Sequence, residues 1–170
     1  LLKVFCMDKI FYLIQVNNVE ELSEVVFNKK LSSDSFKGYA SCLSCAEEKY
    51  LVEKFLTTKD KVWSDFIRKY IEHFPLSDEA VQLLLENTDN SEIKELLLEE
   101  WKKYGANEKE SFAFCDKLHK QDELDEELLT VFCDSAHLAY DDVIYKLSLI
   151  DNKWSERYVN ASKRYMKNVR

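Results

Sequence analysis

The chain has 170 residues, of which 46% are hydrophobic and 33% charged, and its net charge is −8. This hydrophobic content excludes a disordered chain. The acidic balance disfavours general binding to nucleic acid or to an anionic membrane. Two Gly and one Pro are too few for the frequent turns of an all-β fold. We therefore predict an all-α protein of about eight to ten helices.

The first 16 residues are strongly apolar but do not read as a signal peptide or a membrane span. Asp8 and Lys9 interrupt the run, it is too short to cross a bilayer, and no small-residue cleavage site follows. We expect a buried helix here, with a strand as the alternative. The chain begins at Leu1 and its first methionine is Met7, so the sequence leaves open whether it is a fragment.

The next segments predict a turn, a short helix and a longer one. Asn17-Asn18 is typical of a turn, and an amphipathic helix should start at Val19. We expect a loop over 29–35 and a helix over 36–55 that bends at Gly38. Cys42 and Cys45 form a CxxC pair in that helix, and no strand precedes them as in thioredoxin-like motifs. We interpret them as small, half-buried helix residues.

The clearest pattern runs from Leu76 to Gly105 and predicts two helices joined by a turn. Ser77 should cap the first helix with its hydroxyl. The polar run 87–91 breaks the helical spacing, and Asn90 or Ser91 should cap the second helix. Gly105 is suited to the position just after the end of that helix, where a left-handed backbone is common.

This stretch resembles a short two-helix repeat found in some bacterial proteins. The matching residues are Leu76, Ser77, Glu79, Ala80, Leu84, Leu85, Asn90 and Tyr104. The resemblance covers this one unit well and the rest of the chain poorly. It implies a HEAT-like α-solenoid that binds other proteins, and a bacterial source, and it carries no catalytic residues.

A 31-residue register extends the pattern to neighbouring segments. The equivalent sets that we expect in the core are 62/93/124, 66/97/128, 67/98/129 and 70/101/132 in the second helices, and 50/81/112 and 52/83/114 in the first. We therefore predict antiparallel helical hairpins stacked as a short α-solenoid, with an irregular helical bundle as the alternative. Residues 1–45 would form an N-terminal helical cap and residues 46–170 the repeat region.

The five cysteines do not form a disulfide framework, because their number is odd and their spacing loose. This usage indicates a reducing, cytoplasmic setting. Cys115 with His119 and Cys133 with His137 are each four residues apart, which places each pair on one face of a helix. The two pairs should lie at different heights along a hairpin, so we predict no metal site and no cofactor.

Two further groups of residues could carry chemistry. Arg68-x4-His73 is similar to the R-x4–6-H arrangement of HEPN ribonucleases, although five helical residues turn the two side chains about 140° apart. We favour a surface Arg and a helix-terminal His. The acidic clusters at 99–100 and 122–127 should be solvated helix faces and first-turn charges.

The last 20 residues are basic, with six Lys or Arg against Asp151 and Glu156. The binding residues proposed there are Trp154, Arg157, Tyr158, Lys163 and Arg164. We favour a last helix whose aromatic residues pack inward, and self-association through the acidic 77–129 face of a second copy is a further option.

The function predicted from the sequence is a non-catalytic protein-interaction module with a protein partner and no membrane contact. The alternatives are a HEPN-like ribonuclease and a protein that binds nucleic acid through its basic C-terminal helix.

Overall fold

The computed structural model describes residues 2–27, 42–120, 125–150 and 163. Within these residues the chain forms nine helices and no strand, which confirms the all-α prediction. The chain divides into two compact units, residues 1–97 and residues 98–170. The predicted boundary between a cap and a repeat region at 45/46 stays a prediction. Of the described helices, none combines the length and the apolar character needed to cross a membrane.

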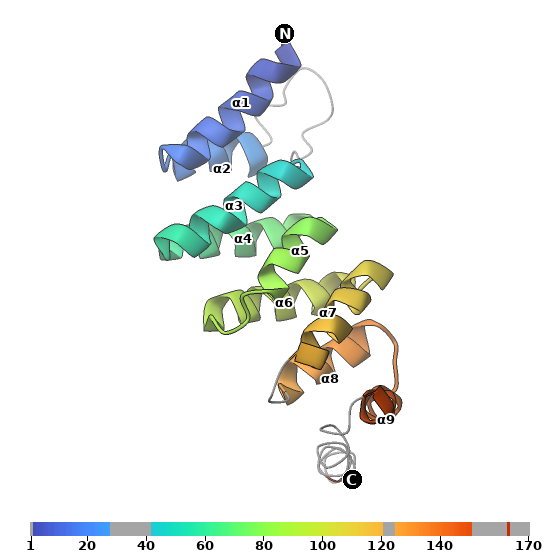
Figure 1. The fold of residues 1–170 in the computed structure, drawn as a ribbon. Coiled ribbons are helices and arrows are strands. Elements are labelled where there is room, and N and C mark those ends of the chain that lie inside the picture. The colour runs from blue at the N-terminus through green and yellow to red at the C-terminus, as the bar shows by residue number, and fades with distance from the viewer. Residues whose placement is uncertain (1, 28–41, 121–124, 151–162, 164–170) are drawn as a thin grey trace. The chain divides into compact units, whose positions relative to one another are not determined.

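The first unit is built from helix pairs. Its helices are α1 (Leu2–Gln15), α2 (Val19–Phe27), α3 (Cys45–Thr58), α4 (Lys61–His73), α5 (Asp78–Leu85) and the start of α6 (Ser91–Tyr104). Helices α1, α3 and α5 lie in one row, and α2 and α4 lie in a second row beside it (Figure 1). The core between the rows contains Leu13, Ile14, Leu22, Val26, Leu51, Val52, Phe55, Trp63, Ile67 and Tyr70.

Local polar signals fix where these helices start. Ser44 caps α3 in a reciprocal capping box with Glu47, and Asp60 caps α4 through the N–H of Val62. The Ser77 hydroxyl accepts from the N–H of Ala80 at the start of α5. These side chains satisfy backbone donors that have no partner inside the helix. The predicted cap at Ser77 is therefore confirmed.

The second unit contains the end of α6 with α7 (Glu108–Lys120), α8 (Glu126–Ser135) and α9 (Tyr140–Ile150). An aromatic cluster of Trp101, Phe114 and Phe132 joins α6, α7 and α8. Its ring centroids are 4.4 to 5.6 Å apart, a spacing typical of stabilising aromatic pairs. Helix α9 packs on α8.

Helix α6 ends as the sequence predicts. Gly105 has a positive φ of 82°, and its N–H donates to the carbonyl oxygen of Trp101 at 2.9 Å. The same carbonyl accepts the Ser135 hydroxyl at 2.9 Å. The end of α6 is thus held both by its own chain and by α8.

The prediction of a helix over 36–55 is wrong at its start. Cys42, Leu43 and Ser44 are not helical, and α3 begins at Cys45. Cys42 and Cys45 are exposed rather than half-buried. The loop over 29–35 and the bend at Gly38 lie outside the described residues.

The 31-residue register predicts burial correctly at several positions of both helix sets, Val52, Val81, Ile93 and Phe114 among them, and wrongly at others. The positions 66/97/128, 67/98/129 and 70/101/132 are all buried. Val62 and Phe112, which the register places in the core, are 38% and 70% exposed. Leu124 lies outside the described residues. The repeat itself stays a prediction.

Candidate functional site

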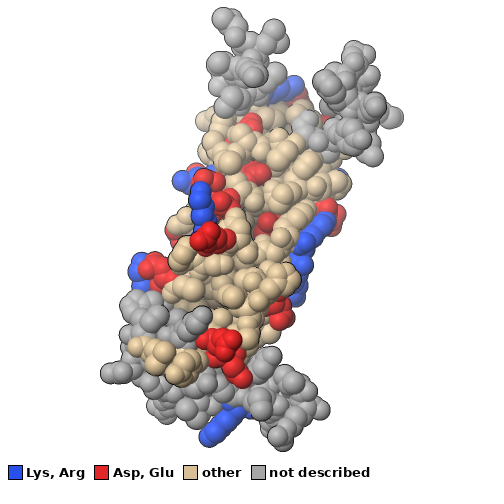
Figure 2. Space-filling view, turned by 90° about the vertical axis from the view of Figure 1, so that its right-hand side faces the viewer, with Lys and Arg blue, Asp and Glu red and all other residues tan. Residues whose placement is uncertain are grey.

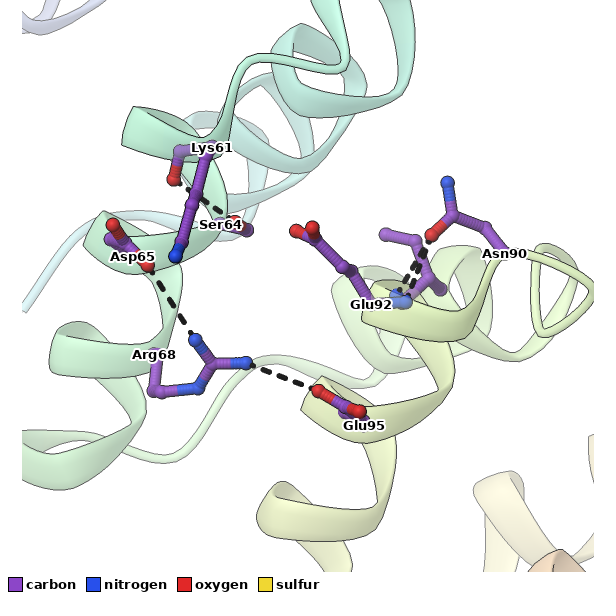
Figure 3. Close-up of polar contacts among 8 residues, drawn as sticks. Lys61, Ser64, Asp65, Arg68, Asn90, Glu92 and Glu95 are labelled. Atoms are coloured by element: carbon purple, nitrogen blue, oxygen red, sulfur yellow. Dashed lines mark hydrogen bonds and ion pairs between the residues drawn. The ribbon is translucent and has the colours of Figure 1, made fainter.

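The candidate site is the exposed side of α4 and the first turns of α6, in the first unit. We call it the Arg68 face and define it by Lys61, Asp65, Arg68, Glu92 and Glu95. Figure 3 shows these side chains on two neighbouring helices, with Arg68 reaching from α4 toward α6.

Arg68 joins the two helices electrostatically. Its guanidinium lies 3.6 Å from a carboxylate oxygen of Asp65, one turn earlier in α4, and 3.6 Å from one of Glu95 in α6. The Arg68 side chain is 33% exposed, against 55% for Asp65 and 65% for Glu95. Pairs this exposed are screened by water and contribute roughly 0–1 kcal/mol each to stability. Their main effect is to hold a charged fork in place at the surface.

The two helix starts beside this fork are fixed by local hydrogen bonds (Figure 3). The Asn90 side-chain oxygen accepts from the N–H groups of Glu92 at 3.0 Å and Ile93 at 3.3 Å. Asn90 is therefore the cap of α6, one of the two residues predicted for that role. In α4 the buried Ser64 hydroxyl donates to the carbonyl oxygen of Lys61 at 3.0 Å.

This arrangement is suited to recognition of charge. A guanidinium is a rigid donor for carboxylates, and flanking carboxylates accept from Lys or Arg of another molecule. The face carries three carboxylates and two cations, so it offers contacts of both signs with an acidic surplus. Figure 2 shows another view of the surface, on which Lys or Arg and Asp or Glu also occur beside one another around uncharged areas. Mixed charge of this kind favours specific pairing.

A second polar group is buried between α3, α4 and α5, and the sequence pattern did not reveal it. Glu48 accepts from the Tyr70 hydroxyl and from the Ser77 backbone N–H, each at 2.7 Å. The Tyr70 hydroxyl also accepts from the N–H of Leu43 at 2.9 Å and lies 3.2 Å from Sγ of Cys42. Burial, followed by the bonds with Cys42 and Glu48, raises the pKa of Tyr70. Because Glu48 and Tyr70 are buried, this network holds helices together rather than meeting a ligand.

Other buried acids also correct the sequence interpretation. Glu100 was predicted on a solvated face but is 2% exposed. Burial and the charge of Glu100 together raise the pKa of Tyr104. Glu110 is buried because it accepts from the N–H of Asn107 in a local cap at the start of α7. In the sequence, each of Glu47 and Glu110 follows a Ser or Asn by three residues. This spacing is typical of a capping box and could have predicted their local bonds.

The structure gives Arg68 and His73 different partners. His73 ends α4, and its Nδ1 lies 2.9 Å from the carbonyl oxygen of Lys69. Its ring lies 5.3 Å from that of Phe27. Arg68 instead faces Asp65 and Glu95. These contacts agree with the interpretation of a surface Arg and a helix-terminal His.

The Cys133–His137 pair does not share a helix face, which corrects the prediction. Helix α8 ends at Ser135, and His137 follows with a positive φ of 56°. Burial, followed by the charge of Asp134, raises the pKa of Cys133 to about 12. Partial desolvation also raises the pKa of Cys115, although the residue is exposed. Both thiols therefore keep their protons at neutral pH, which weakens them as nucleophiles and metal ligands. In the described parts of the chain no three His, Cys, Asp or Glu side chains form a group that could hold a metal ion.

Four of the five binding residues predicted near the C-terminus lie outside the described residues. These are Trp154, Arg157, Tyr158 and Arg164. Lys163 is described and is an exposed residue in helical conformation. The prediction of a binding site there stays a prediction.

Comparisons with known proteins found no match: no protein-family model, no curated protein and no solved structure is similar to this chain.

Proposed function

We propose that the chain is a non-catalytic protein-interaction module made of stacked helical hairpins, a short HEAT-like α-solenoid. The two rows of helices in the first unit support this proposal, because a solenoid needs its first and second helices in separate rows. Free thiols at Cys42, Cys45, Cys115 and Cys133 agree with the cytoplasmic location that we propose for it.

The observation that carries the proposal is the Arg68 fork between α4 and α6. Arg is enriched among the residues that dominate binding energy at protein interfaces. Here carboxylates on two helices pair with it, which favours one side-chain geometry before a partner binds. Val62, which is 38% exposed and three residues before Asp65, adds apolar area at the edge. The partner that fits is a protein segment that combines Lys or Arg for the carboxylates of this face with Asp or Glu for Arg68 and an apolar residue for Val62.

The proposal is tested with the immobilised chain and a cell extract, followed by titration with the purified partner. The variant Glu92→Lys/Glu95→Lys reverses charge on the Arg68 face. The matched control Glu53→Lys/Glu86→Lys makes the same change at exposed positions elsewhere in the first unit. We expect the wild type and the control to capture the same protein from the extract. The Arg68-face variant should not capture it. Equal capture by both variants would contradict the proposal.

A ribonuclease assay tests the opposite view. The wild type, Arg68→Ala and His73→Ala are incubated with single-stranded RNA. We expect no cleavage above background by any of them. Cleavage by the wild type that is lost in both variants would overturn the interaction-module proposal and assign the chain to the ribonucleases.

A further inference from the structure

Two helices in different units expose faces with the same spacing. In α1, Lys9 is followed by Tyr12 and by Val16 just after the helix. In α9, Asp142 is followed by Tyr145 and Leu149. Both sets are spaced i, i+3, i+7, which places their members along one side of a helix. Val16 continues this side because its N–H donates to the carbonyl oxygen of Tyr12 at 3.0 Å, the helical pattern.

These faces are exposed and apolar. Tyr12 and Val16 are 59% and 46% exposed, and Tyr145 and Leu149 are 51% and 68% exposed. Exposed apolar residues in line on a helix give another surface an apolar contact, although patches of this size are common on monomers. Each face is too small for a stable interface by itself, because standard interfaces bury about 1,600 Å² in total. A contact that uses them should therefore be weak.

The first residues of the two faces, Lys9 and Asp142, carry opposite charges. Lys9 lies 3.2 Å from Glu21, and both side chains stay about half exposed, at 53% and 44%. Asp142 is exposed in the first turn of α9. If the two helices pack in parallel, equal spacing brings Lys9 opposite Asp142. The same register brings Tyr12 opposite Tyr145 and Val16 opposite Leu149.

We propose that α1 of one copy packs in parallel against α9 of a second copy. The second copy is the occupant that this pattern selects, because the two faces complement each other in charge and in the order of their apolar residues. A foreign basic or acidic helix would match only one of them. The proposal is independent of the Arg68 face and of the proposed function.

The contact joins two different surfaces, so it is heterologous, and unless the copies close into a ring it leaves one face of each kind open at the ends of the complex. Association should therefore continue past the dimer as concentration rises. Sedimentation velocity from about 10 µM to about 1 mM covers the weak range expected. We expect the weight-average sedimentation coefficient to rise without a plateau at the dimer value.

Mixing two variants tests the pairing of faces. Tyr12→Glu keeps only the α9 face, and Tyr145→Glu keeps only the α1 face. We expect each variant to stay monomeric and their equimolar mixture to form a 1:1 dimer and nothing larger. Phe112→Glu makes the same kind of change at a residue that is 70% exposed and should associate like the wild type. Circular dichroism checks that all variants fold.

A charge swap tests the register. Lys9→Asp and Asp142→Lys each place like charges opposite one another and should reduce association at least several-fold. The double variant Lys9→Asp/Asp142→Lys restores opposite charges and should associate like the wild type.

Three results would overturn the proposal. They are a wild type that stays monomeric throughout the range, a mixture of Tyr12→Glu and Tyr145→Glu that stays monomeric, and a double charge variant no better than the single variants. A closed dimer formed by Tyr145→Glu alone would show α1 pairing with α1 and would overturn it as well.

Discussion

The Tyr70 hydroxyl donates a 2.7 Å hydrogen bond to Oε1 of Glu48, across 22 residues of sequence. The other oxygen of the same carboxylate accepts the backbone N–H of Ser77 at 2.7 Å. One buried side chain on α3 therefore joins α4 and the start of α5. Charge-assisted hydrogen bonds of this kind are stronger than neutral ones, and Tyr70 and Ser77 would each lose one without Glu48.

Removing the Glu48 carboxylate should destabilise the first unit. Glu48→Ala leaves the partly buried Ser77 N–H without its acceptor and the buried Tyr70 hydroxyl with only the weak acceptor Cys42, so we expect the free energy of unfolding to fall by about 2–4 kcal/mol. Glu53→Ala, an exposed glutamate on the same helix, should change it by less than about 0.5 kcal/mol. Urea denaturation followed by circular dichroism measures both. Equal losses in the two variants would show that the network has no special role.

Tyr70 should make stability depend on pH in the alkaline range. The pKa of Tyr70 is raised above its ordinary value of 10.0, chiefly by burial, so the unfolded chain loses this proton first as pH rises. The contribution of protonated Tyr70 to the free energy of unfolding is fully present below pH 10. Above pH 10 it is lost, by up to about 1.4 kcal/mol per pH unit. Tyr70→Phe should therefore show a shallower decline than the wild type between neutral pH and pH 11.

Urea denaturation at a series of pH values tests this slope. Tyr12→Phe, which removes the hydroxyl of an exposed tyrosine, is the matched control and should follow the wild type. If the stability of Tyr70→Phe falls with pH as steeply as that of the wild type, Tyr70 is not the group responsible. Tyr70→Phe should also lose about 1–3 kcal/mol at neutral pH, because Leu43 N–H and Glu48 lose a partner.

Gly105 should tolerate no side chain without cost. A Cβ there would lie 3.2 Å from the carbonyl oxygen of Ser135, and the backbone has a φ of 82°. We expect Gly105→Ala to lower the free energy of unfolding by about 1–3 kcal/mol. Gly105→Asn meets the same Ser135 oxygen but tolerates a left-handed backbone better. The difference in the free energy of unfolding between the two variants measures the strain of the left-handed backbone. If Gly105→Ala is at least as stable as Gly105→Asn, this explanation is contradicted.

Cys133 should be the slowest of the described cysteines to react with iodoacetamide. It is buried, with its pKa raised to about 12, whereas Cys42, Cys45 and Cys115 are exposed. Because the thiolate is the reactive form, we expect alkylation of Cys133 at pH 8 to be at least tenfold slower than that of Cys42. Peptide mass spectrometry over time measures the rates. In urea the difference should disappear, and its absence in the folded protein would disprove the burial of Cys133.

The features that could be predicted from the sequence are those that act within a few residues. The caps at Ser77 and Asn90 and the stop at Gly105 bond to backbone groups no more than four residues away. The true start of α3 could also have been predicted, from the capping-box pair of Ser44 and Glu47.

What the sequence could not supply are contacts between distant segments. Glu48 looks like a surface residue of an amphipathic helix until Tyr70 and Ser77 are brought beside it. In the candidate site the same holds for Arg68, whose i, i+3 partner Asp65 is visible and whose partner Glu95 in α6 is not. Phe112, in a first helix of the register, failed for a related reason. First helices of 14, 8 and 13 residues cannot keep one face inward under a constant 31-residue offset.

The hydrogen bond from Ser135 to the carbonyl oxygen of Trp101 has a consequence for the order of folding. Its two ends are 34 residues apart, and it completes the last turn of α6. During synthesis that turn must wait, without its final partner, until α7 and α8 have left the ribosome and α8 has packed. Helix α6 is therefore begun by its own sequence and completed by a segment made later, so a chain that stops before Ser135 should leave the end of α6 frayed.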